Sequence, residues 1–556
     1  MEGVIEIHGG TLVISSNGNY EKIRSTNLIS GDIVKKHHEN QIELIKRIPQ
    51  AAIGIVHSNT NRIYMPSLIP FSPEIPNNYV CGTRLLLWLH EDGQISIKSV
   101  YTNSPSDDSK IITKAYTTTE DSYQEPFVYQ NHLYTIPHCV NHDDFDTFTI
   151  DPASSKDFDD AITVTPEALY IHIVDIAHFY SSFTPDVVNK LRNRCFTLYL
   201  ENAHTEHLLD TEDSTDNLSL LKGKQRKVIT VKAVLENGLV TSYDIYRSTI
   251  VVKHRYTYEE VQTLLETQQP QKTQYPSLSF LNDLVKLRSQ DITYNINLPS
   301  LRITMNTETE EPEKVICEST NDASHSIVAV AMVLANLIVS KHLAIHHLSL
   351  PNRFHDQIRG INIPDFEKTF NEHVDSYIIV KRFARACYSI DNKGHFGLGI
   401  SDYVHFTSPM RRYADIIVHL LLAGISMPNL ENEVQNINQA QLRNRSLQDL
   451  YKHWKIVRWI KNTPRKTYDA WVTWITPSGL LWYIPEISQN GFAHVSELEP
   501  KQRWSFECGE KPALIGPTHS FKFGQKVKAT VSNIDSNTFI VKVLIETTES
   551  SNNNKI

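Results

Sequence analysis

The sequence predicts a multidomain α+β protein in which small β-barrels flank a larger central α/β domain. Short β-rich segments lie at both ends and helical periodicity is confined to the middle, and the 556 residues exceed what one hydrophobic core can organise. Apolar residues make up 40% and charged residues 21% of the chain, as in ordinary globular proteins. The expected division is 1–48 and 49–122 as two barrels, 123–465 as the central domain, 466–547 as a third barrel and 548–556 as a disordered tail.

The two ends of the chain read as short strands broken by turn-forming residues. Before residue 122, segments such as "GVIEIHG", "QIELIKR" and "TRLLLWLH" alternate with Gly, Asn, Ser and Pro. Their spacing of about 8–12 residues is typical of small antiparallel barrels. The strands after Thr467, among them "TYDAWVTWIT" and "GFAHVSEL", repeat this pattern. These strands predict two barrels before the central domain and one after it.

The central segment combines paired strands with long apolar helices. "AITVTPEALYIHIVDIA" predicts a strand, a turn at Pro166 and a second strand, whereas "IVAVAMVLANLIVSKHLAIHHL" and "RRYADIIVHLLLAGI" have helical periodicity. The longest apolar run, Ser326 to Ser340, covers only about 15 residues, and a membrane-spanning helix needs roughly 20. We therefore expect a buried helix and no membrane contact.

The cysteines and the net charge indicate which cellular compartment and which kind of partner to expect. The six cysteines include no C-x-x-C pair, and the N-terminus has no basic segment followed by an apolar one. A disulfide scaffold, a structural zinc site and a secretory signal are therefore not indicated, which favours a reducing, cytoplasmic compartment. Because the net charge is −9, any polyanion must be met by a local basic path.

Four aspartates crowd the segment "TIDPASSKDFDDAITV", and three interpretations compete for them. A solvated acidic loop is the simplest. A Ca²⁺ loop of the EF-hand type fails, because counting from Asp151 places Lys156 where Gly is needed and Ile162 where Glu is needed. A Mg²⁺ site for phosphodiester chemistry fits, because two such ions can clamp the attacking and leaving oxygens of a phosphate. The aspartates are Asp151, Asp157, Asp159 and Asp160.

A candidate for the positive charge that phosphoryl transfer needs lies far downstream, in "HFTSPMRRYADIIVH". Arg411 and Arg412 follow Pro409 at the predicted start of a helix, where backbone N–H groups also favour phosphate. An arginine pair at such a place is usually a solvated face. Together with the aspartates it predicts a phosphate site.

These two motifs resemble the signatures of the RNB (RNase II/RNase R) exoribonucleases. "TIDPASSKDFDDAI" resembles the aspartate signature, and "GHFGLGISDYVHFTSPMRRYADIIVHLLL" resembles the second signature almost throughout. "VVKHRYTYEEVQ", "LPNRFHDQ" and two segments after the aspartates are weaker matches. The resemblance implies two cold-shock-type OB barrels before an α/β RNB catalytic domain and an S1-type OB barrel after it.

The resemblance also implies an activity and its parts. A processive, monomeric enzyme without a small-molecule cofactor would hydrolyse single-stranded RNA from the 3′ end to nucleoside 5′-monophosphates. Two Mg²⁺ ions, with Mn²⁺ as a substitute, would be held by Asp151, Asp157 and Asp160, while Asp159 and Arg411 would serve the chemistry. The implied RNA contacts are Tyr199, Tyr294, Arg226, Arg353, Ser408 and Arg412, with a core position as the alternative for Tyr294.

Other segments leave their role open. The basic stretch "YKHWKIVRWIKNTPRK" predicts either a phosphate path or an exposed helix face. In the last barrel, aromatic residues are either stacking platforms or core; they are Trp471, Trp474, Trp482 and Phe492.

The chain departs from the family pattern at one place that bears on function. Ala329 and Val330 stand where the family has a Glu pair. Recognition of the terminal ribose is therefore expected to be weaker, unless another acceptor has moved in. The loss keeps an inactive or weakly active RNA-binding protein as the alternative function, against which the intact aspartates and Arg411 argue.

Overall fold

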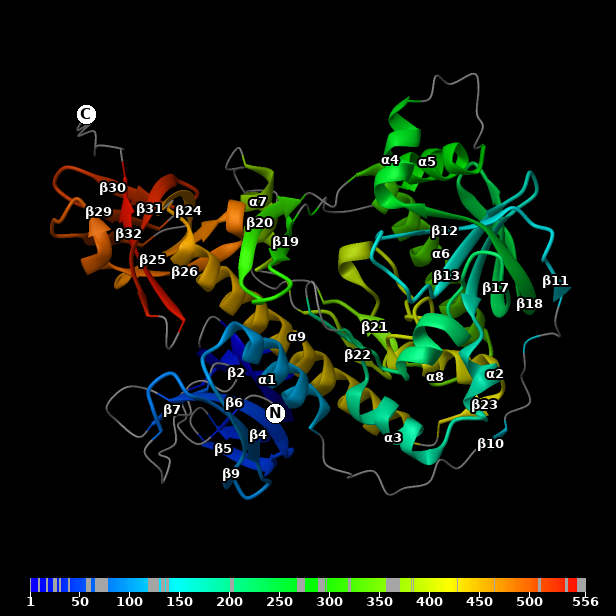
Figure 1. The fold of residues 1–556 in the computed structure, drawn as a ribbon, viewed down its shortest axis with the longest axis horizontal. Helices are drawn as coiled ribbons and strands as arrows, with labels where there is room; N and C mark the ends of the chain where they lie inside the picture. Colours follow the sequence, from blue (N-terminus) through cyan, green and yellow to red (C-terminus); the bar gives the residue numbers. More distant parts are fainter. Residues whose placement is uncertain are drawn as a thin grey trace.

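The chain folds into N-terminal sheets, a central α/β domain and a C-terminal barrel, joined by one long helix (Figure 1). In Figure 1 the central domain lies at the right, the barrel at the upper left and the N-terminal sheets below it. The computed structural model describes residues 2–8, 11–16, 19–23, 28–29, 32–38, 41–56, 62–65, 79–118, 130–131, 136, 140–200, 205–267, 276–288, 296, 298–318, 322–356, 371–381, 383, 385–427, 429–464, 466–508, 512–535 and 539–547.

Two antiparallel sheets form the N-terminal part. The first has the strand order β3-β2-β1-β4-β5 and the second the order β7-β6-β8-β9. Their strands are β1 (Glu2–His8), β2 (Thr11–Ser16), β3 (Asn19–Lys22), β4 (Ile33–His38), β5 (Gln41–Lys46), β6 (Gln50–Val56), β7 (Ile63–Tyr64), β8 (Arg84–Leu89) and β9 (Ile95–Tyr101), and the helix α1 (Pro105–Thr117) follows.

The second sheet is covered on both faces, because successive side chains of β8 point to opposite sides. Leu86 and Trp88 pack against α1 and the long helix α9 (Leu430–Asn462), whereas Leu85 and Leu87 pack among the other strands of the sheet. This two-sided burial fixes the second sheet to the helices that lead to the other domains.

The central sheet closes on itself through one long strand. β18 pairs antiparallel with β17 and, further along, parallel with β12, so that β12, β13, β14, β17 and β18 form a closed cycle with β11 at its edge. The predicted strand–turn–strand around Pro166 is β13 followed by β14. The strands are β11 (Val140–Asn141), β12 (Thr147–Asp151), β13 (Asp160–Val164), β14 (Leu169–Val174), β17 (Gln225–Glu236) and β18 (Leu239–Thr257).

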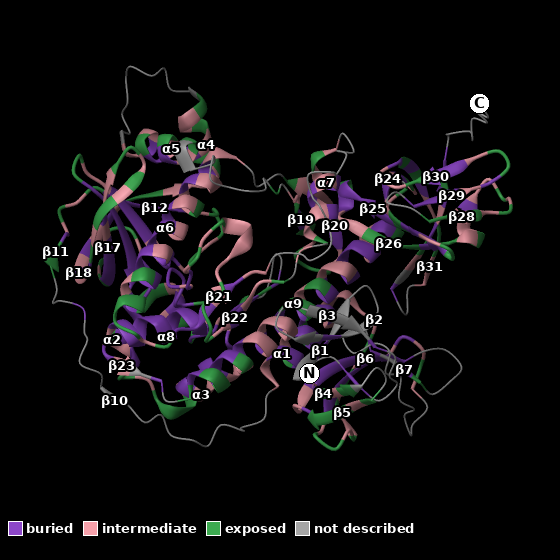
Figure 2. Cartoon of the chain, turned by 180° about the vertical axis from the view of Figure 1, so that it is seen from behind, coloured by how far each residue is buried: buried purple, intermediate pink, exposed green. Residues whose placement is uncertain are grey.

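Helices and short hairpins surround this sheet, and α8 (Tyr413–Leu422) is buried along its whole length (Figure 2). The helix α6 (Ala323–Ile345) is longer than its apolar run. The helix has 23 residues, and an 18-residue window within it has a mean hydropathy of 1.9, so it is long and apolar enough to cross a membrane. Half of that window is nevertheless buried, and the helix packs in the core of the central domain. The other elements are α2 (Ile176–Tyr180), α3 (Pro185–Arg194), α4 (Tyr258–Thr267), α5 (Pro276–Arg288), β10 (Gln130–Asn131), β15 (Leu198–Tyr199), β16 (Thr205–Glu206), β21 (Asn352–Phe354), β22 (Cys387–Ser389) and β23 (Ile425–Ser426). The helix α7 (Glu372–Val380) packs instead on Trp471 and Tyr483 of the C-terminal barrel.

The C-terminal barrel is docked to the rest by α9 and by a hairpin from the central segment. α9 has 33 residues and is therefore about 50 Å long. The hairpin β19 (Ser300–Met305) and β20 (Pro312–Glu318) places Leu301 and Ile303 in the apolar core of the barrel. The barrel strands are β24 (Thr467–Thr476), β25 (Gly479–Ile484), β26 (Gln489–His494), β27 (Leu498–Glu499), β28 (Ser505–Glu507), β29 (Ala513–Ile515), β30 (Ser520–Lys522), β31 (Lys526–Asp535) and β32 (Ile540–Glu546).

A buried ionic cluster centred on Asp108 of α1 joins these parts. Asp108 bonds to Arg84 of β8, and its Oδ2 accepts from Lys455 Nζ at 3.2 Å and Arg458 Nε at 3.0 Å, both on α9. The side chains of Asp108, Arg84 and Lys455 are 0% exposed, and that of Arg458 is 13% exposed. Both predicted roles of Lys455 and Arg458, phosphate path or exposed face, are therefore wrong, because these cations are used inside the protein.

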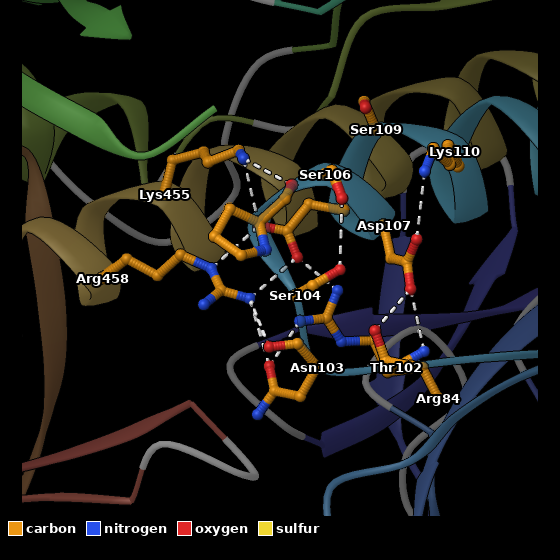
Figure 3. Close-up of polar contacts among 12 residues, drawn as sticks. Arg84, Thr102, Asn103, Ser104, Ser106, Asp107, Ser109, Lys110, Lys455 and Arg458 are labelled. Carbon is orange, nitrogen blue, oxygen red and sulfur yellow. Dashed lines mark hydrogen bonds and ion pairs between the residues drawn. The ribbon is translucent and has the colours of Figure 1, made fainter. Parts of the chain in front are cut away.

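Neutral and aromatic groups complete the cluster, and Figure 3 shows Asn103 between Arg84 and Arg458. Asn103 Oδ1 accepts from Arg84 Nη2 at 2.6 Å and from Arg458 Nη2 at 3.1 Å. The Arg84 guanidinium lies 4.1 Å from the ring centre of Trp454 and 5.1 Å from that of Phe539 in the C-terminal barrel. The second sheet, α1, α9 and the barrel therefore meet at this one cluster.

We predict that Asp108→Ala is strongly destabilising, by about 3–5 kcal/mol, because it leaves three cations without their carboxylate. The matched control is Asp107→Ala on the same helix, which removes only contacts at the protein surface, to Thr102 and Lys110, and is expected to cost about 1 kcal/mol or less. Urea unfolding followed by tryptophan fluorescence measures both. Equal midpoints for the two variants would contradict the structural role of Asp108.

Candidate active site

The four predicted aspartates lie at one end of the closed central sheet. Asp151 is the last residue of β12 and Asp160 the first of β13, while Asp157 and Asp159 lie in the loop between them. Because β12 and β13 are paired strands, their ends bring Asp151 and Asp160 side by side. The predicted cluster is therefore formed by two strand ends and the loop that joins them.

Two residues that the sequence did not single out hold this loop. Ser219 Oγ accepts from Phe158 N at 3.0 Å and donates to Lys156 O at 2.8 Å. Arg255 Nη2 donates to the carbonyl oxygens of residues 152, 153 and 155, and the guanidinium lies 4.9 Å from the Phe158 ring centre. Both lie in segments that resemble the family, "NLSLLKGKQRKVIT" and "VVKHRYTYEEVQ", which is the signal that could have found them.

Asp159 connects the acidic loop to the second motif. Its side chain is 3% exposed, its Oδ1 accepts from Met410 N at 2.8 Å and its Oδ2 accepts from Arg411 Nε at 3.2 Å. Arg411 Nη2 also donates to Ser408 Oγ at 3.1 Å, while 45% of the arginine side chain stays exposed. Asp159 therefore holds Arg411 at the acidic cluster across 252 residues of sequence.

Arg412 is bonded to a different carboxylate, Asp415. Its Nη2 donates to Asp415 Oδ1 at 2.7 Å, and the same oxygen accepts from Ser408 N at 2.8 Å. The Asp415 side chain is 0% exposed, so that Arg412 neutralises a buried carboxylate in this structure. Its predicted RNA contact remains a prediction.

Four of the backbone N–H groups near this helix start, where phosphate binding was expected, already have partners in the structure. Met410 N donates to Asp159, the N–H groups of Arg411 and Arg412 donate to Ser408 O, and Tyr413 N donates to Cys195 O. These four donors are therefore not available to a phosphate in this structure, whereas the exposed part of the Arg411 side chain is. Phosphate binding by the rest of the helix start remains a prediction.

Tyr199 lies beside the cluster at the end of β15. Thr197 N donates to Arg411 O at 3.1 Å, which ties this segment to the second motif. The Tyr199 hydroxyl donates to Asp157 Oδ2 at 2.7 Å, and the residue is 39% exposed. An exposed ring at this distance from the carboxylates is available for stacking on a base.

The remaining predicted RNA contacts are less uniform. Arg226 donates to the carbonyl oxygens of Asp216, Ser219 and Gln225, so it supports a loop in this structure. Arg353 donates to Gln441 Oε1 at 2.6 Å and lines a groove. Tyr294 lies outside the described residues.

Burial makes the carboxylates hold protons to an unusually high pH. It raises the pKa of Asp159 to about 7, against the opposing effects of Arg411 and the Met410 hydrogen bond. It also raises the pKa of Asp151 and of Asp160 to about 7, with added repulsion from Asp159 on the former and from Asp151 on the latter. A cluster with this much repulsion favours a cation.

The donor set fits Mg²⁺, which takes one or two carboxylates and completes its shell with water and phosphate oxygens. Asp151 Oδ2 is buried and has no hydrogen-bond partner, and Asp160 is its charged neighbour. Among the residues that the structure describes, no three His, Cys, Asp or Glu side chains form a group that could hold a metal ion. Asp151 and Asp160 would therefore hold a metal with help from water and substrate.

A groove of about 1350 Å³ lies between β21, α7, α9 and the C-terminal barrel. Five basic side chains and one carboxylate line it: Arg353, Lys381, Arg385, Arg445, Lys452 and Asp449. The pKa of Lys381 is lowered by burial and by the charges of Arg385 and Arg445. The groove is therefore a local basic path on an acidic protein. Lys452, His453 and Ile456 of the predicted basic helix line it.

The exposure of the aromatic residues in the C-terminal barrel shows which of them belong to its core. Trp471 and Trp482 are 9% and 5% exposed, whereas Trp474 and Phe492 are 38% and 46% exposed. Trp474 is opposite Leu481 and Leu481 opposite Phe492 across β24, β25 and β26, so the three form one exposed apolar row. Trp474 and Leu481 also line the groove, which gives its basic wall a surface for stacking.

In sequence, the chain matches one protein-family model and several proteins named ribonuclease R. A model of the RNB domain matches residues 141–427. Ribonuclease R of Chlamydia pneumoniae is 27% identical over 444 residues, which cover 70% of this chain and 63% of that protein. Ribonuclease R of Aquifex aeolicus is 31% identical over 320 residues, or 50% and 44% of the two chains. The alignments therefore span less than two thirds of these relatives' own length.

Solved structures agree on the fold. RNase R of Mycoplasma genitalium, in complex with ribose-methylated single-stranded RNA, matches with a TM-score of 0.75 and 20% identity over 98% of this chain and 100% of that one. Yeast Ssd1, described as a pseudonuclease, matches with a TM-score of 0.70 and 15% identity over 93% and 82%. The predicted fold class, with OB barrels on both sides of a central α/β domain, is confirmed.

We predict that Mg²⁺ binds more tightly as pH rises from about 6 to 8. The folded, metal-free protein keeps protons on Asp151 and Asp160 up to pH about 7, whereas the unfolded chain releases them near 3.8. The unfolding free energy of the metal-free protein therefore falls as the pH rises from about 3.8 to about 7. A metal that binds the ionised carboxylates restores this free energy.

Thermal unfolding at increasing Mg²⁺ measures the apparent affinity at each pH. Below pH about 7 the affinity is expected to rise roughly tenfold per pH unit for each proton released. Asp151→Asn should abolish the effect. The control is Asp213→Asn, because the Asp213 carboxylate accepts from Asn217 Nδ2. Equal Mg²⁺ affinities at about pH 6 and pH 8 would contradict the assignment of the site. Stabilisation by Mg²⁺ that survives in Asp151→Asn would contradict it as well.

Proposed function

Because the chain belongs to the RNB family, as its two motifs predicted, we propose that it is a processive hydrolytic exoribonuclease. It degrades single-stranded RNA from the 3′ end and releases nucleoside 5′-monophosphates. The observation that carries the proposal is the pair of hydrogen bonds from Met410 N and Arg411 Nε to Asp159, which holds an arginine over a cluster of carboxylates.

Each residue of the cluster has a task in this reaction. Asp151 and Asp160 would hold Mg²⁺, or Mn²⁺ in its place; when bound, the ion would supply activation of a water molecule and neutralisation of phosphate charge. Asp159 keeps Arg411 in place, and the exposed part of the Arg411 guanidinium binds the phosphate as charge develops on it. Two ions and a ligand role for Asp157 remain part of the proposal.

The RNA strand reaches the site along surfaces that suit any base sequence. Basic side chains in the groove follow the phosphates, and the row formed by Trp474, Leu481 and Phe492 receives bases. Tyr199 stacks on a base at the scissile end. Stacking of one base contributes about 1–3 kcal/mol whichever base it is, so such a path tolerates all sequences.

The setting completes the proposal. We place the protein in the cytoplasm as a monomer without an organic cofactor and without membrane contact. Free thiols suit a reducing compartment, and the cysteines in the described part of the chain are free: Cys81, Cys195, Cys317, Cys387 and Cys508.

The alternative is an RNA-binding protein with little or no hydrolysis. The structural neighbours include both RNase R and a pseudonuclease, so the fold does not separate the two functions. The complete set of four aspartates and the position of Arg411 favour the enzyme, because RNA binding alone has no need of a buried carboxylate cluster.

The deciding experiment is incubation of 5′-labelled poly(A) with and without Mg²⁺. We predict a Mg²⁺-dependent shortening from the 3′ end and nucleoside 5′-monophosphates as products. Unlabelled RNA added after the start should leave the pattern unchanged if the enzyme is processive. Asp159→Asn should lose hydrolysis and keep RNA affinity, because the amide keeps the shape but loses the charge that holds Arg411. RNA binding without any product in the wild type would establish the alternative.

A second prediction concerns Arg411→Lys. Lysine keeps the positive charge but not the planar fork that contacts Asp159, Ser408 and a phosphate together. The turnover rate is therefore expected to fall about a hundredfold or more while RNA affinity changes by less than about tenfold. Single-turnover kinetics on a short oligoribonucleotide separate the two effects. Equal losses of rate and affinity would count against a role in the transition state.

A further inference from the structure

The segment that carries Arg411 to the acidic cluster, residues 405–411, belongs to no helix or strand. Its middle is nevertheless buried: Phe406, Thr407 and Ser408 are 0%, 2% and 3% exposed. Buried backbone N–H and C=O groups need hydrogen-bond partners, and here neither a sheet nor a helix supplies them. Side chains from two neighbouring helices hold this segment instead.

Asn336 holds the segment from α6. Its Oδ1 accepts from Phe406 N at 2.8 Å, and its Nδ2 donates to the hydroxyl of Tyr403 at 3.1 Å. The residue is 3% exposed and lies in the apolar run of α6, where a polar side chain is costly unless it is hydrogen-bonded. Both of these hydrogen bonds go to residues 403–406, which explains an amide inside this apolar helix.

His419 holds the same residue from α8. Its Nε2 lies 3.0 Å from Phe406 O, and because a carbonyl oxygen can only accept, Nε2 carries the proton. Burial lowers the pKa of His419 to about 4, so the ring is neutral at pH 7. The ring also stacks on that of Phe406, with centroids 4.5 Å apart and planes at 16°. Phe406 is therefore fixed at its N–H by one helix and at its carbonyl by the other.

This fixed residue is close in sequence to the contacts that place Arg411. Ser408, two residues after Phe406, accepts from Arg411 Nη2 through its Oγ, and Met410 N donates to Asp159. A shift of Phe406 therefore moves both contacts. A misplacement of about 1 Å can lower the rate of an enzyme about a hundredfold even when it starts far from the reacting atoms.

We propose that Asn336 and His419 are positioning residues for Arg411, which they aim at the substrate phosphate by fixing Phe406 between α6 and α8. The proposal rests on the proposed function, since it takes Arg411 as the residue that binds the phosphate during hydrolysis. Both side chains are too deeply buried to contact RNA. Their loss is therefore expected to slow cleavage and to leave RNA affinity close to that of the wild type.

The test begins with Asn336→Leu and His419→Leu, which remove the hydrogen bonds to Phe406. Single-turnover cleavage of an oligoribonucleotide at saturating concentration is expected to slow about ten- to a hundredfold in each. His419→Gln, whose amide N–H can replace that of Nε2, should restore most of the rate although the stacked ring is lost. Tyr403→Phe is a milder variant that frees one end of the Asn336 amide, and roughly three- to tenfold slowing is expected, as for one hydrogen bond.

The matched control is Gln525→Leu in the C-terminal barrel. Gln525 is 7% exposed, its Oε1 accepts from Lys522 N at 2.8 Å, and its Nε2 donates to Thr547 Oγ1 at 2.6 Å. The control thus loses the same two kinds of contact as Asn336→Leu, but outside the central domain, and should keep the wild-type rate. In an Arg411→Lys background, Asn336→Leu should slow cleavage no further, because its effect acts through Arg411.

Hydrogen exchange of the amides in residues 405–412, measured without RNA or metal, separates this proposal from the proposed function. Asn336→Leu and His419→Leu should speed this exchange, whereas Gln525→Leu should not. If the wild type cleaves no RNA, the proposed function fails, and the exchange rates still decide whether the two side chains fix the segment. Unchanged exchange overturns the proposal. Wild-type cleavage rates in the two variants, or equal slowing by Asn336→Leu with and without Arg411→Lys, overturn it as well.

Discussion

The candidate site depends on a single buried carboxylate, that of Asp159, which is bonded to the backbone of Met410 and to the guanidinium of Arg411. A carboxylate with 3% exposure is costly to ionise unless its oxygens are satisfied, and here each oxygen has a donor from the second motif. The acidic loop and the arginine helix are thus coupled, because moving either one leaves this charge unpaired. Phosphate chemistry requires an arginine placed beside the metal-binding carboxylates, and this coupling places it there.

A second buried ionic cluster plays the corresponding role for the domains. Asp108 faces three cations, two of them on α9, and an apolar replacement of similar volume could be at least as stable. Such a cluster is therefore better explained by the geometry it imposes than by stability. It sets how the second sheet and the C-terminal barrel meet along α9, and the basic groove lies between α9 and that barrel.

Features encoded by local patterns were predictable from the sequence. The strands around Pro166, the two apolar helices and the aspartate cluster follow from periodicity and from two motifs in the right order. The sequence could not show that Lys455 and Arg458 would be buried, because their partner Asp108 lies about 350 residues away. The sequence also could not distinguish the two adjacent arginines. Arg412 pairs with Asp415 and Arg411 with Asp159, and only the packing decides this. In the barrel, alternation alone did not separate Trp482 from Trp474, because the contacts that cover one side and leave the other open come from distant segments.

The central claim is that Asp159 serves the reaction through Arg411, and a double-mutant cycle of Asp159→Asn and Arg411→Lys tests it most directly. Single-turnover rates of the wild type, both single variants and the double variant on one oligoribonucleotide complete the cycle. If the two residues act as one unit, the double variant is about as slow as the slower single variant. If the two losses multiply, Asp159 and Arg411 act independently and the account is contradicted.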